Sequence, residues 1–259
     1  MRRNWMIQEK VVKRTRSKMG DGMQEHVLLT YYVKYLKEIR MLSDSSINHY
    51  TQAMRRISSY LIEKKKVQET IYEIYDIGQL EVIKEFLYSD PEFVDLDERG
   101  HRMYSAGLNN YFRFAYGEGF ESAKEKIIAL DVEAPIREMD YRIVASRSRY
   151  SIIKIQAIES AGYKCEYDTS HETFISKSTG HPYMEGHHAL PMKYQEKFNH
   201  SLDVYANIIC LCPICHRLLH YGLDEQKKKY IDKIYHERSD RLAKSGLRIS
   251  KDDFCRLVI

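Results

Sequence analysis

The stretch from residue 165 to residue 220 gathers most of the side chains in this chain that bind metal ions well. It contains seven of the eleven histidines and four of the five cysteines. Thiolates and imidazoles are the preferred ligands of zinc and related transition ions. Because chance rarely concentrates both residue types in one segment, this stretch predicts the chemistry of the protein. It also predicts a small fold held together by metal.

A C-P-x-C turn at Cys212 and Cys215 predicts a structural zinc site, because such a turn points two thiolates at one ion. Zinc takes four ligands, so two more are required. Cys165, which precedes the histidine-rich motifs, is the expected third ligand. The fourth is His171 or Asp168, and we favour His171 because structural zinc sites prefer nitrogen and sulfur to carboxylate oxygen.

Two histidine motifs lie in the same stretch. The sequence EGHHALPM occupies residues 185–192, CPICHRLLH occupies residues 212–220, and Asn207 lies between them. In this order the motifs resemble those of the HNH (ββα-metal) endonucleases, especially their bacterial restriction-type branch. The resemblance covers residues 147–240. It departs from the family pattern at Asp168, where many relatives carry a cysteine, and this departure leaves the fourth zinc ligand open.

The resemblance implies a catalytic metal site with a general base beside it. His187 and His216 would bind a divalent ion, Mg²⁺ or Mn²⁺. His188 would be the general base, because a neutral imidazole can take a proton from water near neutral pH. Activated water would then attack the phosphate while the ion stabilises the developing charge.

Three further residues have supporting roles in this interpretation. His220 lies four residues after His216 and therefore on the same helix face. It is either a further metal ligand or a phosphate contact, and we favour the phosphate contact. Asn207 would orient the base or tie the loop that follows the hairpin. Glu185 is expected to support a ligating imidazole from outside the metal's ligand shell.

The secondary structure of this part is expected to be a hairpin followed by helices. Residues 173–175 and 183–190 are interpreted as two strands joined by a turn at residues 177–180. The apolar run that contains Cys210 predicts a buried strand. Residues 223–242 predict an amphipathic helix that covers the core of this part.

The N-terminal part is expected to be helical, because its apolar residues recur at helical spacing. The four expected helices cover residues 27–39, a segment that begins at Ser43 or Asp44 and ends at residue 64, residues 79–88 with a stop at Asp90–Pro91, and residues 99–116. Through the segments SDSSINHYTQAMRRISSYL (residues 43–61) and GHRMYSAGLNNYFRFAYGEGF (residues 100–120), residues 22–120 resemble the core-binding domain of tyrosine recombinases, and this resemblance implies a role in clamping DNA. A plain helical bundle for dimerisation remains the alternative.

Charge and hydropathy give two more expectations. Residues 1–20 carry seven basic side chains and one acidic side chain, although the whole chain has a net charge of only +4. Such a basic arm suits a polyphosphate partner, and a solvated tail is the alternative. The sequence has no apolar run of about 18 residues, so we expect a cytoplasmic protein with no membrane contact.

Together these features predict an α+β, mainly helical fold in which an N-terminal helical bundle precedes a small zinc-stapled ββα-metal domain. The expected parts are a basic arm at residues 1–20, a helical DNA-binding or dimerisation domain at 21–140, and a nuclease domain at 141–259. The expected function is metal-dependent cleavage of double-stranded DNA in restriction or defence. The oligomer expected for such a protein, if it assembles, is a homodimer. The alternatives are a zinc-containing DNA-binding regulator without catalysis and a homing nuclease of a mobile element.

Overall fold

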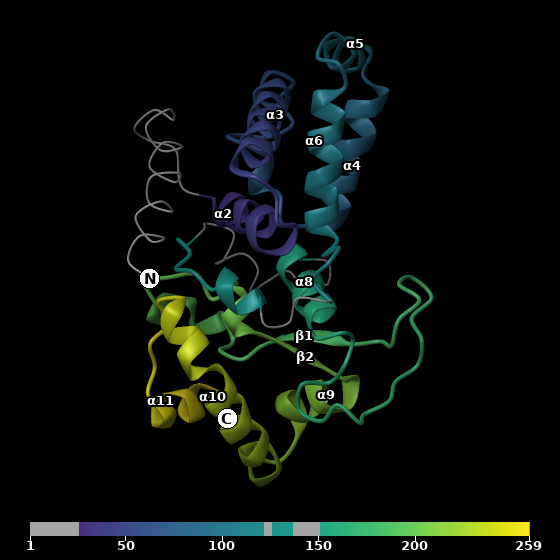
Figure 1. Ribbon diagram of the computed structural model, residues 1–259. Helices are drawn as coiled ribbons and strands as arrows, with labels where there is room; N and C mark the ends of the chain where they lie inside the picture. Colours follow the sequence, from purple (N-terminus) through teal and green to yellow (C-terminus); the bar gives the residue numbers. More distant parts are fainter. Residues whose placement is uncertain (1–25, 122–125, 137–150, 259) are drawn as a thin grey trace.

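The computed structural model describes residues 26–121, 126–136 and 151–258 of the chain (Figure 1). The basic arm expected at residues 1–20 lies outside the described residues. In the described part the fold is α+β and mainly helical, with one two-stranded sheet. No helix among the described residues combines the length and the apolar character needed to cross a membrane.

In chain order the helices and strands divide into an N-terminal half and a C-terminal half. The N-terminal half contains α2 (Val27–Lys34), the π-helical turn η1 (Tyr35–Ile39), α3 (Asp44–Glu63), η2 (Ile71–Glu73), α4 (Ile77–Ser89), α5 (Pro91–Arg99), α6 (Met103–Ala115) and η3 (Lys126–Leu130). The C-terminal half contains α8 (Ile152–Ser160), β1 (Glu185–His188), η4 (Met192–Lys197), η5 (Tyr205–Asn207), β2 (Ile208–Leu211), α9 (Pro213–Tyr221), α10 (Asp224–Lys244) and α11 (Lys251–Val258).

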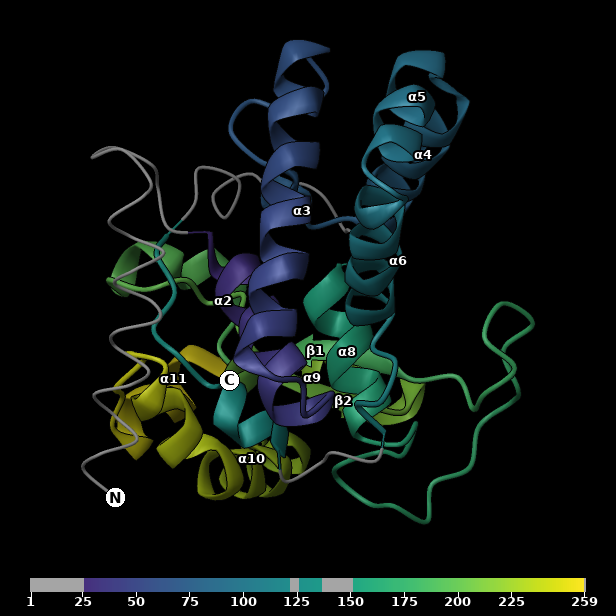
Figure 2. The same ribbon diagram turned by 45° about the horizontal axis from the view of Figure 1, so that its top comes forward.

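Helices α3 to α6 extend side by side on one side of α2 (Figures 1 and 2). Helices α8 to α11 lie with the sheet on the other side of the molecule. Helix α3 begins as expected, because the Ser43 hydroxyl accepts the N–H of Ser46 at 3.2 Å and satisfies one of the unpaired groups of the first turn. Helix α3 then runs beside α6 in both views.

Two helix boundaries differ from the expected ones. Asp90–Pro91 ends α4 as expected, but the same pair also begins α5, because proline at the first turn lacks only an N–H that no helical bond would use. The fourth expected helix was placed from Arg99, whereas α6 begins at Met103. The chain breaks between the two helices because His101 and Arg102 have φ angles of 53° and 58°. Sequence periodicity carries no signal for such a left-handed break.

The contact between α3 and α6 depends on a glycine. A Cβ atom added at Gly107 of α6 would lie 2.7 Å from the Cβ of Ala53 on α3. Real Cβ atoms do not approach that closely, so the two helix backbones are nearer to each other than any side chain at this position would allow. Leu108 and Tyr111, which follow Gly107 on α6, are fully buried.

We therefore expect Gly107→Ala to destabilise the protein. In an exposed helix this change would stabilise by about 1 kcal/mol. Here overpacking against Ala53 outweighs that gain, and we expect a net loss of about 1–3 kcal/mol in the free energy of unfolding. Denaturant unfolding of Gly107→Ala beside Ala106→Ser, an exposed control on the same helix, measures the effect. Equal stability of the two variants would contradict the close helix contact.

The two halves share one hydrophobic core. The rings of Tyr31 on α2 and Tyr205 on η5 lie 4.4 Å apart between centroids. The fully buried side chain of Gln156 on α8 accepts a hydrogen bond from the Tyr205 hydroxyl and donates one to the backbone carbonyl of Phe114. Both ends of this amide are therefore satisfied, so its burial costs little.

A buried ion pair joins the halves at a second place. The guanidinium of Arg241 on α10 donates to both oxygens of Asp131 at 2.7 and 2.9 Å. The Asp131 side chain is completely buried, and the fork of the guanidinium matches the carboxylate. Loss of one partner would leave a buried charge without its counter-ion.

The sheet pairs different segments from those expected. Strand β1 pairs antiparallel with β2, with Glu185 opposite Leu211 and His188 opposite Ile208. The expected partner, residues 173–175, forms the expected turn at 177–180 but stops short of β1, because Ile175 bridges Pro182 and the carbonyl of Phe174 accepts the N–H of Tyr183. All four residues of β2 are buried. This apolar strand therefore gives β1 a packed partner, which the exposed residues 174 and 175 cannot. The strand predicted around Cys210 is thus confirmed, and the hairpin partner predicted for β1 was wrong.

Helices α8 and α9 contact both strands, and they lie on opposite sides of the sheet (Figure 1). In chain order, β1, β2 and α9 therefore form a β-β-α unit, with residues 189–207 as a long connection between the strands. This unit carries the histidine motifs and the C-P-x-C turn.

Candidate metal centres

Cys212 and Cys215 lie at the start of α9 and belong to a first cluster of metal-binding side chains, together with Cys165 and His171. Strand β2 ends at Leu211, and the next residue, Cys212, caps the helix by accepting the N–H of Cys215 on its sulfur at 3.5 Å. Pro213 in the first turn gives the helix a preset φ angle. Both sulfurs therefore lie at one helix end, as the sequence predicts.

Cys165 and His171 come from the loop after α8. Glu166 holds this loop against β2. The N–H of Glu166 donates to the carbonyl of Cys210 at 2.8 Å, and the N–H of Cys210 donates to Glu166 Oε2 at 2.7 Å. Arg238 on α10 donates to Glu166 Oε1 at 2.5 Å and is itself buried. The loop thus continues the sheet by one hydrogen-bonded residue, which places Cys165 beside the helix end.

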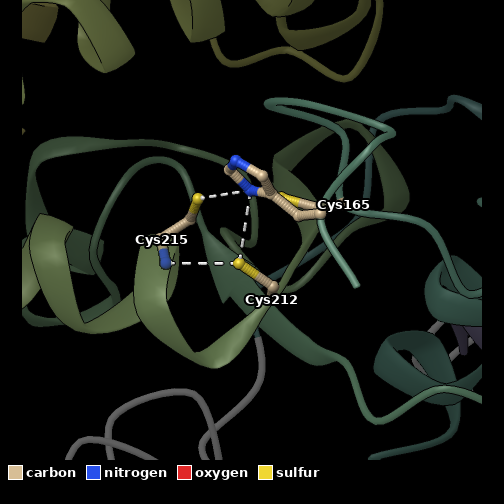
Figure 3. A group of neighbouring side chains, drawn as sticks. Cys165, Cys212 and Cys215 are labelled. Atoms are coloured by element: carbon tan, nitrogen blue, oxygen red, sulfur yellow. Dashed lines mark hydrogen bonds between the residues drawn. The ribbon is translucent and has the colours of Figure 1, made fainter. Parts of the chain in front are cut away.

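Cys165, His171, Cys212 and Cys215 form a cluster that can hold a metal such as zinc. The sulfurs of the three cysteines lie close together (Figure 3), and all four ligand atoms lie within 4.8 Å of one another. His171 Nδ1 is 3.5 Å from Cys212 Sγ and 3.3 Å from Cys215 Sγ. Zinc with bonds of about 2.3 Å to sulfur and about 2.0 Å to nitrogen, in a tetrahedron, requires about 3.5 Å between such atoms.

Asp168 has a different place. Its Oδ1 accepts the N–H and the hydroxyl of Ser170 at 2.9 and 2.7 Å, and these hydrogen bonds hold its pKa below the usual range. Its Oδ2 lies 3.7 Å from Nε2 of His171, the nitrogen that faces away from the sulfurs. Of the two alternatives for the fourth ligand, the geometry favours His171, with Asp168 as a carboxylate behind it.

The electrostatics of the cysteines call for a cation. Burial raises the pKa of the Cys215 thiol, and the neighbouring sulfur of Cys212 raises it further. Burial also opposes ionisation of Cys165, but hydrogen bonds from the N–H groups of Cys212 and Asp168 outweigh it and lower the pKa of this thiol. Several thiolates this close are stable together only when a metal ion balances their charge.

The second cluster joins β1 to α9. His187 on β1 and His216 and His220 on α9 offer three ring nitrogens within 4.8 Å of one another. The ring centroid of His187 lies 5.1 Å from the ring centroids of His216 and His220, and these two ring centroids lie 4.8 Å apart. The two α9 residues lie on one helix face, one turn apart, as their spacing predicts.

Glu185 orients one of these imidazoles. Its Oε2 lies 2.6 Å from His216 Nδ1, and its Oε1 accepts the hydroxyl of Tyr183 at 3.1 Å. Because Nδ1 is held by the carboxylate, the neutral ring of His216 presents Nε2 to the cluster. A carboxylate behind an imidazole is the usual support of a metal-ligating histidine.

The environment keeps the three histidines in the form that binds metals. Burial lowers the pKa of His187 well below its ordinary value, and the nearby imidazoles lower it further. Burial likewise lowers the pKa values of His216 and His220, although Glu185 partly opposes the shift at both. Neutral imidazole at neutral pH is the ligand form.

His188, the next residue along β1, has a separate partner. Its Nε2 lies 3.1 Å from Oδ1 of Asp203, and the side chains are 11% and 2% exposed, respectively. Alternation along the strand explains why His187 reaches α9 while His188 reaches the connection between the strands. A buried carboxylate accepts the Nε2–H, so it restricts the orientation of the ring.

Asn207 ties the connection between β1 and β2. Its side chain is fully buried, and its Oδ1 accepts the N–H of Leu190 at 2.7 Å. Its amide donates to the carbonyls of Leu190 and Leu202 at 2.9 and 2.8 Å. Of the two roles left open for this residue, these contacts favour the tie to the loop over contact with His188.

Sequence reasoning missed two residues near these histidines. Asp203 lies fifteen positions after His188, and no local pattern links the two. Lys154 on α8 presses on β1, because a Cβ at Gly186 would lie 3.2 Å from its Cβ and Cγ. Burial lowers the pKa of Lys154, and the charge of Asp203 partly opposes this shift. A glycine between Glu185 and His187 was the available signal, since it indicates close approach of another element.

No family model, no curated protein and no solved structure matches this chain.

We expect the four-residue cluster to bind about one zinc ion per chain and to depend on His171 but not on Asp168. His171→Ala and Cys215→Ser should lose the metal and unfold at lower temperature, because structural zinc binding stabilises the fold. Asp168→Asn and Cys255→Ser, a cysteine outside the cluster, should retain it. Metal analysis of the purified variants gives the answer. Zinc lost from Asp168→Asn but kept in His171→Ala would reverse the ligand assignment.

Proposed function

We propose that this protein is a metal-dependent endonuclease that hydrolyses phosphodiester bonds in double-stranded DNA. The observation that carries the proposal is the adjacency of His187 and His188. One residue joins a three-histidine cluster, and the next is paired with the buried carboxylate of Asp203. Metal ligands beside an oriented imidazole are what water activation at a phosphate requires. The resemblance of the motifs to those of HNH endonucleases supports the same chemistry.

His187, His216 and His220 are the residues that would hold the catalytic ion. A divalent ion bound there supplies positive charge for the phosphate oxygens and for the leaving oxygen. We now favour His220 as a ligand over a phosphate contact, because its ring nitrogen lies with those of the other two. Three imidazoles suit Mn²⁺ or another transition ion better than Mg²⁺, which prefers oxygen ligands.

His188 would take the proton from the attacking water. Asp203 accepts a hydrogen bond from Nε2–H, so the ring carries its lone pair on Nδ1. The carboxylate would also stabilise the imidazolium that forms when the proton is taken. Asn207 would contribute indirectly, because it fixes the loop that begins directly after His188.

The biological setting that we propose is cleavage of foreign DNA in a bacterial cell, and the motif resemblance is its support. A single site of this kind cuts one strand at a time. A homodimer, with contacts from the N-terminal helices, would bring two sites to one duplex.

The protein should nick and linearise supercoiled plasmid with Mn²⁺, and more slowly with Mg²⁺. His188→Ala should reduce the rate at least a hundredfold, because general base catalysis contributes about 10²–10⁴. Agarose gels over time measure both rates, and zinc content shows that the variant is folded.

Two outcomes would count against the nuclease. Wild-type protein that binds plasmid but leaves it intact with every divalent ion would favour a non-catalytic DNA-binding protein. Equal cleavage by His188→Ala would assign the activity to a contaminant or to another site.

Asp203→Asn tests the carboxylate behind the base. Asparagine keeps the size and an acceptor oxygen at this position but removes the charge, so the imidazolium loses its counter-ion. We expect a loss of about tenfold or more in rate, less than that of His188→Ala, with zinc content and affinity for DNA unchanged. Asp95→Asn, an exposed carboxylate on α5, is the matched control and should cut at the wild-type rate. A wild-type rate for Asp203→Asn would remove the carboxylate from the proposal.

A further inference from the structure

Residues 173–183 form an arm that projects from the body of the protein (Figures 1 and 2), and in chain order the arm lies between His171 of one cluster and His187 of the other. The arm is a short ribbon. The N–H of Tyr183 donates to the carbonyl of Phe174 at 2.9 Å, and the N–H of Ser176 donates to that of His181 at 2.8 Å. Gly180, with a φ angle of 72°, closes the tip by donating to Ser176 at 2.8 Å. The tip is therefore an ordered turn.

Two large apolar side chains of the arm face solvent. Phe174 is 65% exposed and Ile175 is 62% exposed. Neighbours in an extended chain point to opposite faces, so both faces of the ribbon are apolar near its middle. Phe174 stacks on Tyr183 with ring centroids 4.9 Å apart, which fixes its direction. Adjacent exposed apolar groups on a projecting element are typical of a binding surface.

The charges of the arm fit an anionic partner. Residues 173–183 contain one lysine and no aspartate or glutamate, and the nearest carboxylates in the chain are Glu172 and Glu185 at the base of the arm. Lys177 is exposed at the tip, together with the hydroxyl groups of Ser178 and Thr179. Lysine and hydroxyl side chains are common phosphate contacts in protein–DNA complexes.

The arm is connected to both clusters. At its start it follows His171, a member of the four-residue cluster. At its end the hydroxyl of Tyr183 donates to Glu185 at 3.1 Å, and Glu185 holds His216 at 2.6 Å. Phe174 is thus one ring contact and two polar contacts away from the three-histidine cluster, so the arm has a defined position relative to it.

We propose that the arm enters the major groove of double-stranded DNA next to the phosphate that would be hydrolysed at the three-histidine cluster. A two-stranded ribbon fits a groove about 12 Å wide. Phe174 and Ile175 contact base edges there, and Lys177 contacts the backbone. This inference rests on the proposed function, and it adds the element that holds the duplex and reads its bases.

The experiment measures binding of a short fluorescein-labelled duplex by anisotropy, with His188→Ala as the parent so that the DNA stays intact. Ile175→Ser is compared with Val82→Ser, because Val82 on α4 is equally exposed, at 63%. Ile175→Ser and Phe174→Ser should bind about tenfold more weakly, or about 1.4 kcal/mol, since each removes an apolar side chain that the bases would bury. Val82→Ser should bind as the parent does. Lys177→Gln should reduce the slope of log affinity against log salt by about one.

Binding by Ile175→Ser and Phe174→Ser that equals the parent's would overturn the proposal, as would a parent that binds no duplex. Sedimentation that shows a dimer lost in the arm variants would make the arm a self-association surface and would also overturn it. Zinc content confirms that each variant is folded. Plasmid cleavage by wild type is scored separately. Cleavage with unchanged binding by the arm variants would reject the arm alone, and weakened binding without any cleavage would reject the nuclease alone.

Discussion

The four-residue pairing of β1 with β2 determines where both clusters lie. Strand β1 carries Glu185, His187 and His188, and β2 leads directly into the cap of α9. Because side chains alternate along a strand, a shift of one residue in β1 would turn His187 away from α9. Gly186 opposes such a shift, since a residue with a side chain in its place would bring a Cβ atom within 3.2 Å of Lys154 on α8. A short apolar strand therefore positions polar chemistry that it does not itself contain.

Strand β1 directs its two histidines to different sites. His187 faces the helix with the other histidines, whereas His188 faces the connection that carries Asp203. In the function that we propose, metal binding and proton transfer are thus assigned to opposite sides of one backbone. The carboxylates follow the same division, because Glu185 supports a ligand and Asp203 supports the base. His216 and His188 therefore have different acidic partners.

The sequence predicts most of what is local and little of what is not. The C-P-x-C turn, the one-turn spacing of His216 and His220, and the cap at Ser43 all concern residues a few positions apart, and the structure contains each of them. The partner of β1 was misplaced, because the true partner lies beyond a connection of nineteen residues, 189–207, whereas the expected one was a nearby hairpin. Asp203 was missed for the same reason. Its meeting with His188 depends on the loop that Asn207 ties in place, and no spacing rule encodes it.

The contacts of Gln156 bear on how such a protein can change over evolution. One amide satisfies groups from both halves, and Tyr205 in the C-terminal half packs on Tyr31 in the N-terminal half. If the halves were separated, two tyrosine rings and a polar side chain would lose their partners at once. Exchange of the β-β-α unit without the N-terminal helices would therefore leave these buried groups without their partners. A new specificity would have to arise by changes on surfaces that already surround it, with the helices inherited together with the histidines.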